Sequence, residues 1–188
     1  MQTFKIQIED LIGSVGDDTL ISSSIQDIGA EIISVAPFDK LKNVTKNTAI
    51  SSGGLNVGAK KIIAVDKSDY AAREIPAMDK ARYKSTASIY AGSDTSPVFY
   101  VEGQNVFVIG TAATGETSGT LHFVPIVPTS DGDVAIAHGD ATIEHFPKEA
   151  IRLLVVGGAT RCLQRLLSDK TSSLPSDVSE IVLPVPPI

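Results

Sequence analysis

The sequence predicts an α+β fold in which N-terminal and long C-terminal helices pack as a helical bundle, with a β-rich middle insertion and an extended C-terminal tail. Three observations predict it: apolar residues recur at helical spacing near both ends, runs rich in Val, Ile, Thr and Tyr fill the middle, and prolines interrupt the last apolar residues. The 188 residues suffice for one domain with a substantial core. We expect this domain over residues 1–170, with helices over about 8–36 and 147–169, strands over about 40–126, and the tail over 171–188.

The N-terminal helix is predicted mainly by the segment DDTLISSSIQDIGAEIISVAP, residues 17–37. Asp17 and Asp18 offer side-chain oxygens that can cap the first turn, and Pro37 ends the helix. Between them, apolar residues recur at intervals of four, three, four and three, which places them on one face of a helix. These residues are Ile21, Ile25, Ile28, Ile32 and Val35. Gly29 and three serines lower the helix propensity, so we expect this helix to depend on packing against a partner.

The middle of the chain is predicted to be β-structure because short β-branched and aromatic runs alternate with Gly, Ser, Asn and Asp. KKIIAVDK is a strand, and REIPAMDKARYK is a strand end followed by a helical turn. SPVFYVEGQNVFVIG is a hairpin that turns between Glu102 and Asn105. GTLHFVPIVP adds a strand whose prolines indicate an edge position.

The C-terminal helix is predicted by FPKEAIRLLVVGGATRCLQRLLSDK, where Pro147 suits the first helical position. Its apolar residues cover more than half of its circumference, so the helix is either central to the core or shared with another subunit. The pair Gly157 and Gly158 costs about 1 kcal/mol per residue relative to Ala, which close approach of a neighbouring backbone can offset. We assign Leu154, Gly157, Gly158 and Leu163 to subunit packing.

The last residues, TSSLPSDVSEIVLPVPPI, combine prolines that forbid a helix with too many apolar side chains for a solvated tail. An extended apolar segment of this kind requires a groove, on its own domain or on another chain. We therefore expect a partner-binding tail. Its contact residues are Ile181, Val182, Leu183, Val185 and Ile188.

The polar segment SDGDVAIAHGDATIEHFPKEA is the strongest candidate for chemistry, because it holds His138, His145 and four carboxylates. Their spacing matches neither a zinc site of the H-E-x-x-H type nor a calcium loop, so we expect no metal there. GGLNVGAKK lacks the G-K-[ST] ending of a phosphate loop, and no G-x-S-x-G elbow occurs. Cys162 lies on the apolar stripe of the C-terminal helix, where we expect a buried, inert thiol. We expect no enzyme, no cofactor and no metal.

The bulk composition limits the possible partners. The net charge of −6 disfavours a nucleic-acid grip, which needs clustered Lys and Arg, but suits a surface past which DNA slides. The single cysteine makes the fold independent of an oxidising compartment. No apolar run approaches the length of a membrane span, which takes about 18 residues, and the N-terminus is unlike a signal peptide. We expect a soluble protein made in the cytoplasm.

The order of these elements resembles the head-to-tail connector proteins, also called adaptor or head-completion proteins, of tailed double-stranded DNA phages. The resemblance spans about residues 8–170: a helix that opens with DDT and ends near EIISVAP, a β-rich middle with SPVFYVEGQNVFVIG, and a long helix that begins FPKEAIRLLVVGG. It implies helices packed as a bundle and a ring, commonly of twelve subunits, beneath the portal. It also implies contact with a downstream neck or tail protein and with passing DNA that is not bound specifically.

The resemblance implies a structural virion protein of the phage neck, which we expect to be made in the host cytoplasm and to carry a tail that docks on the portal or on a neighbouring subunit. Because the β-rich middle is larger than is usual in that family, another phage tail or baseplate protein stays open. A small metal-dependent hydrolase that uses residues 131–145 is the third alternative.

Overall fold

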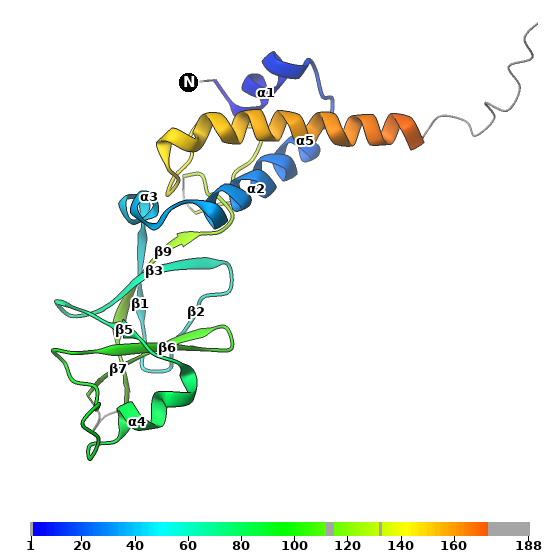
Figure 1. Cartoon of the computed structure of the whole chain (residues 1–188). Helices are drawn as coiled ribbons and strands as arrows, with labels where there is room; N and C mark the ends of the chain where they lie inside the picture. Colours follow the sequence, from blue (N-terminus) through cyan, green and yellow to red (C-terminus); the bar gives the residue numbers. More distant parts are fainter. Residues whose placement is uncertain (1, 112–114, 132, 173–188) are drawn as a thin grey trace, which may run out of the picture.

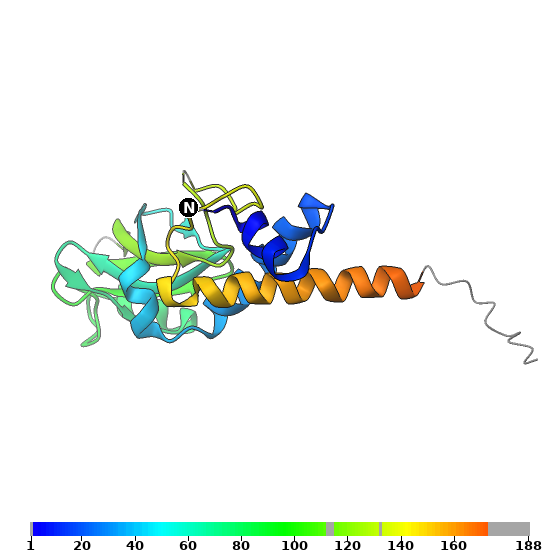
Figure 2. The ribbon, with the colours of Figure 1, turned by 90° about the horizontal axis from the view of Figure 1, so that it is seen from above.

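The structure is a computed structural model that describes residues 2–111, 115–131 and 133–172, and these residues form a helical layer and a β-body (Figure 1). The helical layer consists of α1 (Phe4–Ile12), α2 (Asp18–Val35) and α5 (Ile151–Ser172). The short helix α3 (Phe38–Leu41) and the 3-10 turn Lys42–Val44 lead from α2 into the β-body, which extends from residue 46 to residue 125. Seen from above, the C-terminal part of α5 projects away from the rest of the molecule (Figure 2).

Local capping explains where α1 and α2 begin. The Asp17 carboxylate accepts hydrogen bonds from the backbone N–H groups of Thr19 at 2.9 Å and Leu20 at 3.1 Å, so this predicted N-cap of α2 is confirmed. Thr3 caps α1 in the same way. Gly13 and Gly16 adopt φ values of 82° and 71°, a conformation that L-residues rarely adopt, and they separate α1 from α2. The helical stretch over residues 8–36 is therefore two helices.

The core of the helical layer lies where α5 crosses α2 and α1. Val124 at the end of a strand and Ile136 and Phe146 of the loop that precedes α5 complete this core, so it is built from helices, strand and loop together. The helices contribute Phe4, Ile8, Ile21, Ile25, Ile33, Leu41, Leu154, Val155, Ala159 and Cys162. Lys61 fixes the C-terminal end of α2, because its ammonium donates to the carbonyl oxygens of Ile33 at 2.8 Å and Ser34 at 3.0 Å.

The first sheet of the β-body is antiparallel, with the strand order β1-β9-β3-β4. Its strands are β1 (Lys46–Ile50), β9 (Gly119–Pro125), β3 (Lys60–Lys67) and β4 (Tyr70–Ala71). The predicted strand KKIIAVDK is confirmed as β3. The predicted edge position of GTLHFVPIVP is wrong, because β9 pairs with β1 on one side and β3 on the other. Pro125 is its last residue, so the proline interrupts no internal ladder position.

The second sheet has the strand order β2-β7-β6-β5, and β8 also pairs with β7. Its strands are β2 (Leu55–Asn56), β5 (Arg73–Glu74), β6 (Val98–Glu102), β7 (Asn105–Thr111) and β8 (Gly115–Thr117). The predicted hairpin is confirmed, because Val98 pairs with Ile109 and Glu102 pairs with Asn105 across the β6–β7 turn. The predicted helical turn after β5 is also present, as the 3-10 turn Ala77–Asp79 and α4 (Lys80–Lys84).

Both faces of the second sheet are covered. One face packs on the first sheet through a core of Ile50, Val57, Val65, Phe99, Val106, Val108, Leu121 and Phe123. The other face packs against α4 and the turn before it, through Ile75, Val98, Tyr100 and Ile109. The β-body therefore has its own hydrophobic core, as a two-sheet sandwich does.

The predicted fold class, a helical bundle with a β-rich insertion, is wrong. The described residues instead form a mixed fold of five α-helices and two multi-stranded sheets. The strands bury their apolar residues between two sheets, and the helices complete their core with Val124, Ile136 and Phe146 rather than with further helices. The extended C-terminal tail of the prediction lies outside the described residues.

Candidate functional site

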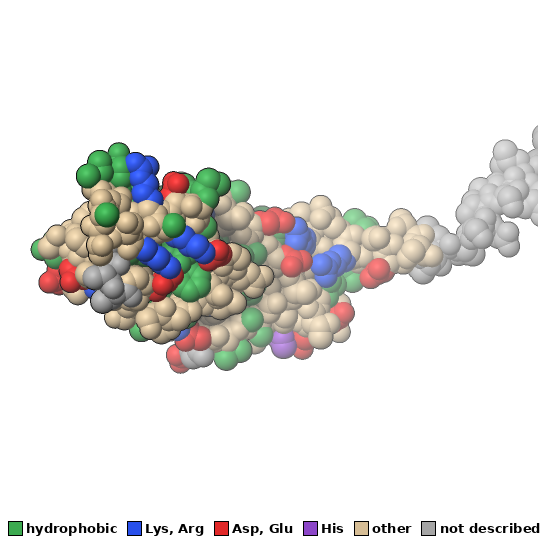
Figure 3. Space-filling model, turned by 90° about the horizontal axis from the view of Figure 1, so that it is seen from below, with side chains coloured by type: hydrophobic (Ala, Val, Ile, Leu, Met, Phe, Trp, Pro, Cys, Tyr) green, Lys and Arg blue, Asp and Glu red, His purple; other side chains and the backbone are tan. Residues whose placement is uncertain are grey.

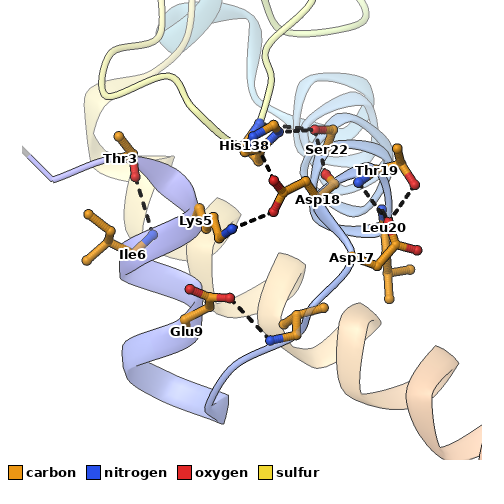
Figure 4. Close-up of polar contacts among 11 residues, drawn as sticks. Thr3, Lys5, Ile6, Glu9, Asp17, Asp18, Thr19, Leu20, Ser22 and His138 are labelled. Atoms are coloured by element: carbon orange, nitrogen blue, oxygen red, sulfur yellow. Dashed lines mark hydrogen bonds and ion pairs between the residues drawn. The ribbon is translucent and has the colours of Figure 1, made fainter.

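The polar loop before α5, the first candidate for chemistry, folds onto the beginning of α1 and α2 (Figure 4). His138 lies at its centre. Its backbone N–H donates to Ser22 Oγ at 3.1 Å, its Nδ1 lies 3.2 Å from the same oxygen, and its Nε2 lies 3.3 Å from an Asp18 oxygen. The Lys5 ammonium lies 2.7 Å from the other Asp18 oxygen. The hydrogen bond from Lys5 lowers the pKa of Asp18, and the same bond raises the pKa of Lys5.

The other polar groups of this loop point to different neighbours. Asp140 accepts a hydrogen bond from the backbone of Ala137 at 2.8 Å, and Asp133 forms an ion pair with Lys46 of β1. His145 Nδ1 lies 3.1 Å from the carbonyl oxygen of Val44. Each of these contacts attaches the loop to itself, to α2 or to the start of the β-body. The loop is therefore a structural junction between the helical layer and the β-body.

No group of three or more His, Cys, Asp and Glu side chains in the described part of the chain could hold a metal ion. The expectation of a chain without metal or catalysis stays a prediction. The structure also shows where two further candidates from the sequence lie, the GGLNVGAKK segment and Cys162. The GGLNVGAKK segment contains a turn in which Gly54 lies under the ring of Phe107, and Cys162 is buried beneath α2.

The four α5 residues assigned to subunit packing divide between the inside and the outside of the molecule. Leu154 is fully buried, and Gly158 lies directly against Ile25 and Ile8, where an added Cβ would come within 3.0 Å and 3.3 Å of their side chains. Gly157 lies against Ile28 of α2 in the same way. The close approach inferred from the glycine pair is thus made within the subunit. Leu163 is 40% exposed and faces outward.

Leu163 belongs to an apolar stripe on the outer face of α5, which we call the outer stripe. Its members are Leu153, Val156, Leu163 and Leu167, which are 63%, 47%, 40% and 62% exposed. With Thr160 between them, they recur at intervals of three, four, three and four, the spacing by which two helices pack along a shared seam. Residues after Cys162 are mostly exposed, which fits the projection of α5 beyond α1 and α2 (Figure 2).

A second uncovered apolar surface, which we call the apolar groove, lies where α2 ends, α3 begins and α5 starts (Figure 1). It is lined by Ile32, Val35, Ala36, Pro37, Lys40, Pro147, Glu149, Ala150 and Leu153. Its two charged members, Lys40 and Glu149, form an ion pair of 3.3 Å with each other. All the other lining residues are apolar. The hollow continues along α2 to Ile28 and Glu31. Sequence reasoning missed this groove, although its α2 wall belongs to the predicted apolar stripe.

Positive side chains on the surface are mixed with negative ones. On the face seen from below, Lys and Arg alternate with Asp and Glu (Figure 3). Arg161 contacts both Asp27 and Glu31, and Lys80 lies 2.6 Å from a Glu102 oxygen. Cations that are already paired with carboxylates are poor partners for phosphates, so Arg161 and Lys80 are poorly placed to bind nucleic acid.

No family model matches this chain, and no curated protein matches it either. Among the described helices, none combines the length and apolar character that crossing a membrane requires. The tail residues Ile181, Val182, Leu183, Val185 and Ile188, which the sequence predicts to bind a partner, lie outside the described residues. The candidate functional surfaces of the described chain are therefore the outer stripe and the apolar groove.

Proposed function

We propose that this protein is a structural subunit that assembles with copies of itself into a ring at the neck of a tailed phage, where it connects the portal to the tail and lines the DNA channel. The observation that carries the proposal is the outer stripe of α5, a row of exposed leucines and valine at the spacing of a helix seam. The neck location rests on the order of elements described from the sequence.

The outer stripe supports self-association on energetic grounds. Burying a leucine or valine side chain contributes about 1.5–3 kcal/mol when it was fully exposed. Four half-exposed side chains therefore offer several kcal/mol per contact, against an association cost of about 4–15 kcal/mol. One such contact binds weakly. In a closed ring each subunit makes two contacts, through the outer stripe on one side and through a different surface on the other, so modest contacts add up to a stable assembly.

The charge distribution supports the DNA channel. The net charge is −6, and Arg161 and Lys80 are already paired with carboxylates. A channel wall of this kind repels DNA rather than retaining it, which is what passage requires.

Measurement of the mass of the full chain in solution tests the self-assembly. We expect light scattering and electron microscopy to show rings, and the double variant Leu163→Glu, Leu167→Glu to be monomeric with unchanged helix content. Ser168→Glu is the control for an added carboxylate, because it introduces one glutamate on the same turn but about 100° around the helix from Leu167. A wild-type chain that stays monomeric at high concentration contradicts the proposal, as does a double variant that still forms rings.

Binding to purified portal protein tests the location. We expect rings of the wild-type chain to co-sediment with portal rings and not with tail-tube protein alone. Rings that bind the tail tube and ignore the portal would instead make this a tail or baseplate component.

A further inference from the structure

We infer that the apolar groove binds residues 181–188 of a neighbouring copy of this chain, so that each subunit of the assembly is fastened to the next by an exchanged arm. The inference rests on the proposed self-assembly and adds the site and the occupant. It joins two features, an uncovered apolar groove and an apolar, proline-rich segment that cannot form a helix.

The groove is formed by the chain's own packing before any partner arrives. The predicted apolar stripe of α2 begins inside the core with Ile21 and Ile25, both fully buried. Toward the C-terminus of α2 the same stripe emerges, so that Ile32 lines the groove and Val35 is 81% exposed. Lys61 holds the carbonyl end of α2 in place, which keeps this wall rigid. A rigid wall lowers the ordering cost of binding.

The shape of the groove matches an extended segment. From Ile28 to Ala36, the α2 wall rises by about 12 Å at 1.5 Å per residue. Four residues of a polyproline II helix cover about the same length at 3.1 Å each. The segment IVLPVPPI provides such a stretch, and its prolines favour that conformation before binding. Its apolar side chains suit a lining in which Lys40 and Glu149 already neutralise each other.

The reach of the chain favours a neighbouring copy over the same subunit. The groove lies at the start of α5, and Ser172 lies at the other end, about 28 Å from Leu153 along the helix. The nine-residue step from Ser172 to Ile181 spans about 15–18 Å as a flexible chain and about 30–32 Å when fully extended. To place Ile181 in the subunit's own groove, the linker would have to be almost fully stretched and folded straight back along α5. A groove on an adjacent copy requires no such stretching.

Disulfide trapping between two full-length versions of the chain tests this inference. One version carries Val35→Cys in the groove, and the other, enlarged by a tag, carries Val185→Cys in the arm. A mixed disulfide between the two sizes forms only between copies. Val134→Cys replaces Val35→Cys in the matched control, because Val134 is another exposed valine, 63% exposed, and lies outside the groove. We expect the Val35 pair to give about tenfold more mixed dimer than the Val134 pair, as an arm held close to the groove implies.

Three outcomes of the trapping experiment would contradict the inference. Equal trapping at Val35 and Val134 overturns the inference, because contact would then be random. A chain that carries both Val35→Cys and Val185→Cys and closes only on itself also overturns it, since the arm would lie in its own groove. The third outcome is that a Leu167→Cys version forms the mixed disulfide with Val35→Cys while the Val185→Cys version does not. The occupant of the groove would then be the outer stripe of α5 from another copy, and the inference would be wrong.

The mass of the chain without residues 181–188 separates this inference from the proposed ring. We expect the deletion to lower the assembly to monomers at concentrations where the full chain is assembled. Rings that persist without the arm overturn the inference and leave the proposed function intact. A monomeric full chain that still gives the Val35–Val185 mixed dimer on oxidation supports the groove and contradicts the ring.

Discussion

The helical layer and the β-body bury their apolar residues in opposite ways. In the β-body, one face of the second sheet is covered by the first sheet and the other by α4, and its most exposed large apolar side chains, Met78 and Ile89, lie in turns. In the helical layer, α5 is covered on one side only, and its exposed side chains are aligned. The comparison teaches that the described residues of the β-body cover both faces of its second sheet, whereas the described helical layer leaves an aligned apolar face of α5 exposed.

The two regions also use charge differently. In the β-body, the Glu116 carboxylate receives hydrogen bonds from the Lys84 ammonium and, at 2.6 Å, from the Tyr100 hydroxyl. These hydrogen bonds lower the pKa of Glu116 to about 2, and the bond from Lys84 makes the largest contribution. Burial raises the pKa of Tyr100. In the helical layer, Arg161 and Arg165 bridge α5 to exposed carboxylates of α2. Such exposed pairs contribute little to stability, so packing has to hold α5 in place.

The largest effect is expected from Leu154→Ala, which removes a fully buried side chain between α5 and α2. It should lower the free energy of unfolding by about 2–5 kcal/mol, because it loses burial and leaves a cavity. Chemical denaturation measures this loss. Leu153→Ala is the matched control, since the adjacent leucine is exposed and should cost below about 0.5 kcal/mol. Equal losses at the two positions would contradict the two-faced arrangement of α5.

Glu116→Gln should have the next largest effect and should act through the β-body. The folded-state pKa of about 2 lies below the ordinary value of 4.5, so ionised Glu116 stabilises the fold at neutral pH, and this contribution is lost as the pH falls from about 4.5 to about 2. We expect the variant to lose about 1–3 kcal/mol at pH 7 and to converge with the wild type near pH 2.

Glu102→Gln is the control for that measurement. Glu102 pairs with Lys80 in a more exposed position, so its loss should cost at most about 1 kcal/mol. A loss at Glu116 that does not change between pH 7 and pH 2 would show that the Lys84–Glu116–Tyr100 contact is not what stabilises this side of the β-body.

Local patterns in the sequence predict several elements of this fold, while their arrangement depends on contacts between distant residues. The N-cap at Asp17, the strand KKIIAVDK and the β6–β7 hairpin were predictable because capping, alternation and turn chemistry act over a few residues. The central position of β9 was not, because its partners are distant along the chain: paired residues are 69–77 apart for β1 and 54–65 apart for β3. The break between α1 and α2 lies at Gly13 and Gly16. The two glycines are visible in the sequence, but the apolar residues on either side of them suggested one continuous helix.

The candidate surfaces show the same limit. The sequence predicts that α5 is apolar around most of its circumference, but it cannot tell which part faces the core. The structure places Leu154 and Gly158 inside and Leu163 outside, because Ile8 and Ile25 of the other helices pack on the glycine side. The groove was also hidden in the sequence, since Ile32 and Val35 share a stripe with the buried Ile21 and Ile25. Where that stripe emerges from the core is decided by where α3 and Pro147 lie.

A smaller effect is expected from Asp17→Ala at the start of α2. The variant leaves the backbone N–H groups of Thr19 and Leu20 without their side-chain acceptor, which should lower the melting temperature measured by thermal unfolding. The side-chain hydrogen bond from Thr19 lowers the pKa of Asp17, so the cap weakens as the carboxylate is protonated at acidic pH. Asp17→Asn should recover most of the loss, because asparagine also caps. A variant as stable as the wild type would mean that packing alone positions α2.

The smallest effect on the stability of the single subunit is expected from Leu167→Ser. This variant tests most directly whether the exposed face of α5 differs from the covered β-body by having a partner. Leu167 is 62% exposed and lies on the part of α5 that projects past α1 and α2, so it contributes little to the subunit's own core (Figure 2). At concentrations where the chain is monomeric, its free energy of unfolding should change by less than about 0.5 kcal/mol. At assembling concentrations, the same variant should lower the melting temperature relative to the wild type, because partner binding stabilises the folded state by mass action. Thermal unfolding at two protein concentrations provides the measurement. If the wild type and the variant show the same concentration dependence, the outer stripe has no partner, and the contrast between a covered β-body and an open helical layer loses its functional meaning.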